Sequence, residues 1–410
     1  MEIADFDDTQ IQSFVSKWYK DLPSNYSRFM KEFSRPENCG LRQLARTPLL
    51  LALLCLAFDE TMTFPSRRVE LYREALDALL KKWDASRGIK RDEIYRGLSS
   101  IRKEQLLSWL AAKNFTTGTI FFEQEILCSQ ISSYLRKLPG NRDEPDGEAV
   151  LKAIEAQHGI LVEYAHRIYS FLHLTFQEYL TARYIVENFG AGNALKEFVE
   201  NSSDARWHEV LLLVVSLLGN ADYFFEEMIR VARRVLTVNP NCNRLINWVS
   251  NKAISSSRPD AYGRALLLLA ALDLVRCSLY KDLAEDLYKD FPVLYATMRD
   301  LQSVLDIALD LAIQLDPNND KSLSCLSLLV ANKYDNDNLR IYKIASEVYS
   351  SLHVRFTKED LDTSWHDFSV RDVQALQQYL VISRLIIECL EFAVVSDREG
   401  ITSRMILPWK

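Results

Sequence analysis

Apolar side chains recur with helical spacing through residues 1–90. In residues 8–19 they occupy the i, i+3, i+4 and i+7 positions that form one helix face. A second helix is expected to start at Pro48, because proline is favoured in a first turn and apolar residues follow it. A third helix is expected over residues 65–83, where leucines and aromatics again form one stripe. We therefore predict a small helical bundle, the first domain, over residues 1–90.

The pattern changes over residues 91–190. Helices are expected at residues 98–112, 123–138 and 148–157, with a short piece at residues 119–122 between the first two. Two runs rich in β-branched and aromatic residues follow, at residues 159–164 and 167–172, and Ala165 and His166 join them. Helices followed by a two-stranded hairpin are typical of a winged helix, which we predict for residues 91–190.

Beyond Gly190 the chain consists almost entirely of apolar runs of helical length. The runs are separated by clusters of residues that interrupt helices, at residues 219–220, 239–241, 255–259, 316–320 and 335–338. No fixed repeat length occurs, although a solenoid would require one. We predict an irregular α-helical array over residues 191–410, so the fold class of the whole chain is mostly α.

The charge balance argues against a nucleic-acid partner. The formal net charge of the chain is −7. A nucleic-acid-binding surface needs lysines and arginines to replace the counterions of the phosphates. We therefore expect no nucleic acid among the partners.

The cysteines and the longest apolar run indicate a cytoplasmic protein. Seven cysteines are scattered without a CxxC pair, which is typical of reduced thiols. The apolar run at residues 47–58 is shorter than the roughly 20 residues that cross a bilayer. The first residues are acidic, unlike a signal peptide. We expect no association with a membrane.

No motif of an independent catalytic site occurs. The chain has no GxxxxGKS/T phosphate-binding loop, no GxGxxG, no GxSxG elbow and no HExxH helix. His353 and the segment 365–367 lack a cysteine or a second histidine at ligand spacing. We predict no catalytic residue and no metal site, and we expect that the chain is not an enzyme on its own.

His173 is the residue that could meet a phosphate. It lies between the second predicted strand and a helix, and a helix start offers free N–H groups and a positive dipole end. Taken alone, a histidine beside aromatic side chains is more typical of a structural residue. Thr175 and Glu178 have the spacing of a capping box, which predicts that Thr175 caps the helix.

Four further segments of the sequence carry a resemblance to a known family. They are RTPLLLALLC at residues 46–55, RVELYREALDALLKKW at 68–83, FLHLTFQEYL at 171–180 and RWHEVLLLVVSLLGN at 206–220. In this order they resemble NACHT-type signal-transduction NTPases, the group that includes NOD-like receptors and their bacterial relatives. The third segment resembles the signature at the end of the winged-helix domain in that family. The chain is similar to the C-terminal part of such a protein, without its P-loop core.

The resemblance implies a nucleotide-dependent switch. In that family a winged-helix histidine contacts the phosphates of ADP in the closed state, and a proline of the helical domain lies near the adenine. The matching positions are His173 and Pro48. ATP or ADP would be bound only with an upstream NTPase core or a homologous chain, and not by this chain alone. Residues 191–410 would bind a protein or another ligand and couple it to oligomerisation, as in bacterial defence signalling.

Two other functions stay open. A nucleotide-independent helical scaffold, binding another protein through residues 191–410, would need no role for His173. A winged-helix DNA regulator would need a basic recognition helix, whereas the candidate helix at residues 123–137 has two acids and only two terminal bases. The sequence does not identify the activating ligand, the effector, the oligomeric state, or whether Met1 is a natural start.

Overall fold

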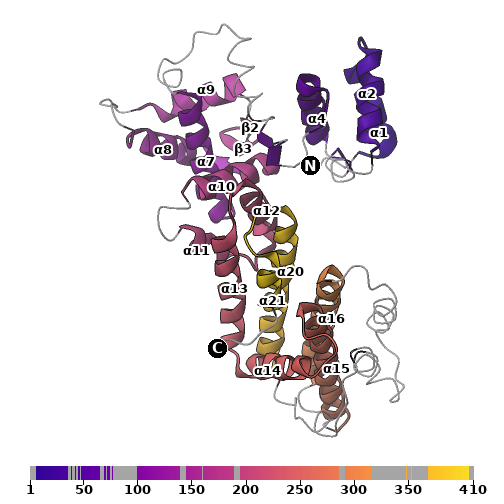
Figure 1. The fold of residues 1–410 in the computed structure, drawn as a ribbon. Coiled ribbons are helices and arrows are strands. Elements are labelled where there is room, and N and C mark those ends of the chain that lie inside the picture. Colours follow the sequence, from indigo (N-terminus) through magenta and orange to yellow (C-terminus); the bar gives the residue numbers. More distant parts are fainter. Residues whose placement is uncertain are drawn as a thin grey trace. The chain divides into compact units, whose positions relative to one another are not determined.

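The chain folds into two compact units, Met1–Gly190 and Ala191–Lys410. The computed structural model describes residues 6–35, 38, 42, 45–46, 48–64, 69–70, 72–73, 76, 99–138, 145–158, 160–188, 194–285, 291–315, 348, 352 and 368–405. Both units are mostly helical, and the first also contains a small antiparallel sheet (Figure 1). The predicted fold class is confirmed. The predicted helix at residues 65–83 falls mostly outside the described residues, as does the predicted boundary after residue 90, which stays a prediction.

The first three described helices are α1 (Asp8–Trp18), α2 (Pro23–Phe33) and α4 (Pro48–Thr61). The helix expected after Pro48 is confirmed. Its buried residues recur at helical spacing, and Phe58 meets Phe29 of α2 edge to face with ring centroids 5.1 Å apart. Both rings are fully buried, and burying a phenylalanine side chain contributes about 1.5–3 kcal/mol. Apolar packing of aromatic rings therefore joins α2 to α4.

The predicted hairpin is confirmed within a three-stranded sheet. The elements of this part of the unit are α7 (Ser100–Thr116), β1 (Phe122–Glu123), α8 (Gln124–Leu135), α9 (Gly147–His158), β2 (Leu161–Ala165), β3 (Ile168–Phe171) and α10 (Leu174–Glu187). Strand β3 lies between β1 and β2 and is antiparallel to both. Because Ala165 pairs with Ile168, the turn consists of His166 and Arg167, one residue later than predicted. Arg167, the second residue of the turn, adopts a left-handed conformation with φ of 60°.

The element order corrects the choice of recognition helix. In a helix-turn-helix the second helix of the pair enters the DNA groove. That helix is α9, directly before the hairpin, and not the segment 123–137. The lysine of α9, Lys152, lies 3.3 Å from the carboxylates of both Glu155 and Glu163. The charge of this lysine is therefore neutralised within the protein.

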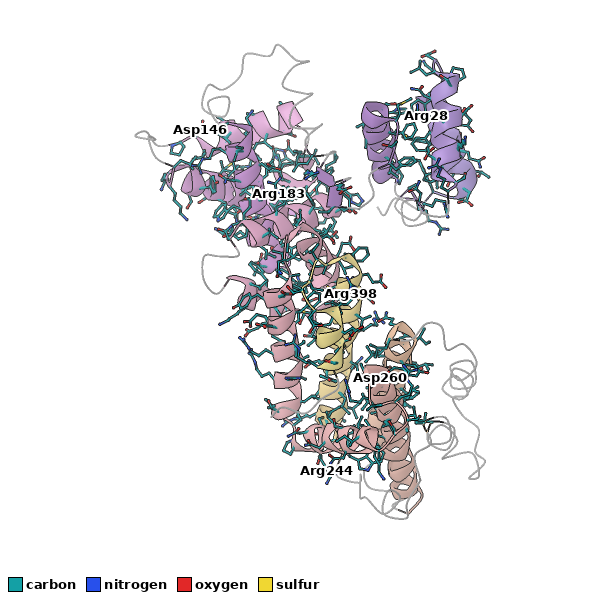
Figure 2. The ribbon with its side chains drawn as sticks, viewed as in Figure 1. Arg28, Asp146, Arg183, Arg244, Asp260 and Arg398 are labelled. Atoms are coloured by element: carbon teal, nitrogen blue, oxygen red, sulfur yellow. The ribbon has the colours of Figure 1, made fainter. Side chains whose placement is uncertain are left out.

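Two polar links hold α7 to its neighbours. Arg183 of α10, drawn in Figure 2, forms ion pairs with Glu104 of α7 and, at 2.9 Å, with Glu187. Asn114 of α7 and Gln130 of α8 are buried and exchange two amide hydrogen bonds, of 2.9 and 3.2 Å. Removing one amide would leave the other unsatisfied at a cost of about 1–3 kcal/mol. The Arg183–Glu104 pair thus ties α10, which carries the candidate site, to α7, and the amide pair ties α8 to α7.

The second unit is an array of helices, as predicted. Its elements are α11 (Ala194–Val199), η2 (Ala205–Trp207), α12 (His208–Leu217), α13 (Asp222–Thr237), α14 (Pro240–Ile254), α15 (Ala261–Glu285), α16 (Phe291–Leu315), α20 (Val370–Phe392) and α21 (Arg398–Ser403). Helix α20 packs against α12, α13 and α16 and is buried along most of its length (Figure 1). Among the described residues, no helix combines the length and the apolar character needed to cross a bilayer.

Two arginines, one buried and one half-buried, hold the last described residues of the chain. Arg264 of α15 is 6% exposed, and its guanidinium donates to the carbonyl oxygens of Ser403 at 2.7 Å and Met405 at 3.0 Å. Arg233 of α13 donates to the carbonyl oxygen of the residue between these two, at 2.9 Å. Carbonyl groups at a helix end lack helical partners, so the arginines satisfy them. The segment after α21 is thereby fixed to the second unit.

Candidate functional site

His173 lies at the junction of β3 and α10. It is the residue that caps α10, and its backbone is extended, with φ of −148° and ψ of 147°. Its Nδ1 atom accepts a hydrogen bond from the backbone N–H of Thr175 at 3.2 Å and lies 2.8 Å from the Thr175 hydroxyl oxygen. The imidazole therefore caps the N-terminus of α10, a role that a serine, threonine or aspartate side chain usually has.

The predicted capping box of Thr175 and Glu178 is wrong. Because His173 supplies the cap, α10 begins at Leu174 and Thr175 is its second residue. The Thr175 side chain supports the histidine ring instead. The sequence signal for this role was the two-residue spacing of His173 and Thr175, which lets a side chain reach a backbone N–H nearby.

The hydrogen bonds of His173 determine its tautomer. A lone pair on Nδ1 faces the Thr175 N–H, so the proton of the neutral ring lies on Nε2. Desolvation of the half-buried ring lowers the pKa of His173, which favours this neutral form. Within the described part of the chain, the Nε2–H group has no hydrogen-bond acceptor. The site therefore offers a fixed donor.

The surroundings of His173 combine a rigid base with an apolar rim. Phe176 and Gln177 are each 1% exposed, and Gln177 Nε2 donates to the carbonyl oxygen of Thr119 at 3.1 Å. Leu172 and Leu174, on either side of the histidine in sequence, are 42% and 40% exposed. The buried face fixes the first turn of α10, while the exposed leucines leave apolar surface beside the donor.

Pro48 is the first residue of α4 and is half-buried. The position suits a proline, whose missing N–H and fixed φ are compatible with a first turn. Pro48 and His173 belong to the same unit, and no hydrogen bond of the described residues joins them. The adenine contact predicted for Pro48 and the phosphate contact predicted for His173 stay predictions.

No metal centre appears among the described residues. No group of three or more histidine, cysteine, aspartate or glutamate side chains there could hold a metal ion. His353 and the segment 365–367, considered as ligands from the sequence, lie outside the described residues.

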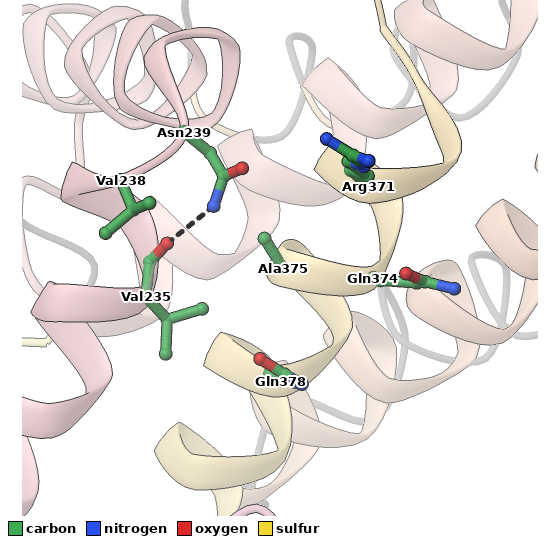
Figure 3. A pocket seen from close by; sticks show the side chains of 7 residues that line it. All are labelled: Val235, Val238, Asn239, Arg371, Gln374, Ala375 and Gln378. Carbon is green, nitrogen blue, oxygen red and sulfur yellow. Dashed lines mark hydrogen bonds between the residues drawn. The ribbon is translucent and has the colours of Figure 1, made fainter.

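A pocket of about 280 Å³ lies in the second unit, between the end of α13 and the start of α20 (Figure 3). Its lining residues are Val235, Val238, Asn239, Arg371, Gln374, Ala375 and Gln378. Asn239 Nδ2 is bonded to the Val235 carbonyl oxygen at 2.9 Å, so that amide is already engaged. The lining contains one charged side chain, Arg371, and no acid–base pair. Its composition supports no catalytic role.

Comparison with known families identifies the domain around His173. Residues 68–185 match the winged helix-turn-helix domain that lies C-terminal to NACHT. The chain contains a NACHT-associated winged helix. The matched range includes α7, the sheet and His173, and it excludes Pro48. No curated protein matches the chain.

The match confirms the resemblance to a C-terminal part of a NACHT-type protein. A winged helix of this kind is a regulatory region and not the catalytic core of the NTPase. The matched range begins within residues 1–90, where a separate helical domain was predicted. An upstream NACHT domain is the partner that the match implies for this part of the chain.

Proposed function

We propose that this chain is the regulatory and sensor portion of a NACHT-type NTPase switch, which closes over ADP held by an upstream core. The observation that carries the proposal is the donor at His173, which lies in the NACHT-associated winged helix and has a fixed tautomer. A phosphate oxygen is a suitable acceptor for Nε2–H, and the positive end of α10 adds favourable electrostatics. A hydrogen bond to a charged phosphate contributes about 1.5–3 kcal/mol.

The proposal has four further parts, which concern Pro48, hydrolysis, residues 191–410 and the cellular role. Pro48 would form an apolar wall for the adenine at the start of α4. The chain alone would not hydrolyse nucleotide, because its sequence contains no phosphate-binding loop. Residues 191–410 would bind a protein or another ligand and shift the population toward an open, oligomerising state. A cytoplasmic role in defence signalling belongs to the same proposal.

The test is ADP and ATP binding by calorimetry, on this chain alone and on the chain joined to an intact upstream NACHT core. The informative variant is His173→Ser, because serine retains the helix cap but lacks the imidazole donor. We expect binding only by the joined form, and ADP binding about tenfold weaker or more in the variant. Thr175→Val, which removes the hydroxyl contact but keeps the backbone N–H bond to the ring, should weaken ADP binding less.

The rival proposal is a nucleotide-independent helical scaffold. It predicts that His173→Ser leaves ADP binding by the joined form unchanged, or that the joined form does not respond to nucleotide. Either result would contradict the switch proposal and favour the scaffold.

A further inference from the structure

A basic and aromatic patch lies on the winged helix, along α7 and at the C-terminal end of α8. Trp109 of α7 contacts Tyr134 of α8, with ring centroids 5.4 Å apart. The ammonium groups of Lys113 and Lys137 lie 5.0 and 5.7 Å from the centroid of the Trp109 ring. Arg102 lies about two turns before Trp109 on the same face of α7, and its guanidinium donates to the Gln105 side chain at 3.1 Å. We call Arg102, Trp109, Lys113, Tyr134 and Lys137 the Trp109 patch.

Lys113 and Lys137 of the Trp109 patch differ from three other bases of the winged helix, which are paired with carboxylates. Arg167 is paired with Glu125 at 3.1 Å, and Lys152 and Arg183 each hold two carboxylates. Lys113 and Lys137 are exposed, and neither has a carboxylate partner among the described residues. In a chain with a net charge of −7, two exposed lysines beside one tryptophan, neither paired with a carboxylate of the described residues, form a local exception.

The helix ends and the tryptophan ring beside the two lysines do not neutralise their charges. A cation near a helix C-terminus is stabilised by the helix dipole, and a cation near a tryptophan is stabilised by the ring. Both effects orient the ammonium groups, and neither supplies a counter-charge. The lysines are thus pre-organised, which lowers the entropy cost of binding an anion.

The geometry also distinguishes between kinds of anionic partner. Single-stranded nucleic acid binds through bases that stack on open aromatic faces, whereas the Trp109 ring is already occupied by the lysines and by Tyr134. Duplex DNA would be read by α9, whose lysine is neutralised by Glu155 and Glu163. Trp109 and Tyr134 are half-buried, so they do not protrude as a membrane anchor would.

We propose that the Trp109 patch is a docking surface for an acidic segment of a partner protein. Carboxylates of the segment would pair with Lys113 and Lys137, and Arg102 would extend the positive surface along α7. This interaction is independent of nucleotide and of His173.

The experiment measures binding of a fluorescent glutamate and aspartate peptide to the full chain by anisotropy, at low and at physiological salt. The variant is Lys113→Gln with Lys137→Gln. The matched control is Lys17→Gln with Lys31→Gln, which removes the same charge from exposed positions on α1 and α2. We expect the patch variant to bind the peptide about fivefold more weakly and the control variant to bind it normally. Binding to the wild type should weaken at physiological salt, because exposed charges are screened.

A second control is the variant Lys113→Arg with Lys137→Arg. It changes the same two positions but retains both charges, so it should retain peptide binding. Equal losses in the patch and control variants would overturn the proposal, because the attraction would then be non-specific. It would equally be overturned if the wild type failed to bind the peptide, or if duplex DNA or anionic vesicles bound more tightly than the peptide.

Discussion

His173 and His208 both stand at the start of a helix, but their surroundings give them opposite protonation behaviour. His173 caps α10 and is bound by Thr175, its own neighbour in sequence. His208 is the first residue of α12, and its Nε2 atom is hydrogen-bonded to Glu388 on α20. Burial lowers the pKa of His173, whereas the hydrogen bond to Glu388 raises the pKa of His208.

The difference shows that a position at the start of a helix does not by itself set the pKa of a histidine. The positive end of a helix disfavours a charged imidazole in both places. At His208 the carboxylate of Glu388, which also contacts Arg384 at 3.2 Å and Gln314 at 3.3 Å, outweighs this effect. The partner side chain, and not the position in the helix, determines the charge of the histidine.

The largest expected effect concerns the buried face that holds the first turn of α10 and thereby positions His173. Phe176 is 1% exposed, so Phe176→Ala should lower the free energy of unfolding by about 3–4 kcal/mol through lost burial and a residual cavity. Leu174→Ala, on the exposed side of the same turn, should change it by less than about 0.5 kcal/mol. Urea unfolding of the whole chain measures both, and similar values for the two variants would contradict this account.

A smaller effect is expected from the cap itself. His173→Ala should destabilise the first unit by about 1 kcal/mol, because the N–H of Thr175 loses its acceptor. His173→Ser should recover most of that loss. If alanine and serine were equally destabilising in urea unfolding, the histidine would stabilise the unit by packing and not as a cap.

The ion pair of His208 should show itself in the pH dependence of stability. The pKa of His208 is raised in the folded state, so its contribution is complete below the ordinary value of 6.5 and is lost as the pH rises through the folded pKa. Because the pair is partly exposed, Glu388→Gln should cost only about 0.5–1 kcal/mol near pH 5.5. The cost should shrink near pH 8.5. A loss that grows with pH in urea unfolding would have the wrong sign.

His173 should show the opposite pH dependence, with the smallest effect. Its pKa is lowered, so its neutral form stabilises the fold above 6.5, and that contribution is lost as the pH falls. Proton NMR of the two imidazole C2–H resonances, assigned with His173→Ser and His208→Gln, should find His173 titrating below His208. The reverse order would invalidate the comparison.

Sequence analysis predicted the elements whose pattern is local and repeated. The run of β-branched and aromatic residues at 167–172 indicated a strand, and the apolar run after Pro48 indicated a helix. Strand β1 was missed because two residues are too few to show alternation. The contact between His208 and Glu388 could not be predicted, because the two residues lie 180 positions apart in sequence. The donor at His173 was proposed from its position, whereas its tautomer required the Thr175 hydrogen bond.

The anchoring of the tail by Arg264 has a consequence for evolutionary comparison. Its acceptors are the main-chain oxygens of Ser403 and Met405, which every amino acid possesses. Replacing the exposed Ser403 side chain would leave its acceptor in place, so the identity of this residue can change while the arginine is retained, whereas the buried Met405 is also held by its packing. Covariation between positions would then not reveal the contact, although deleting the tail would strand a buried guanidinium. Such an attachment requires only that the backbone reaches the arginine. A sequence alignment would show this requirement as a segment of constant length and not as a pair of matched residues.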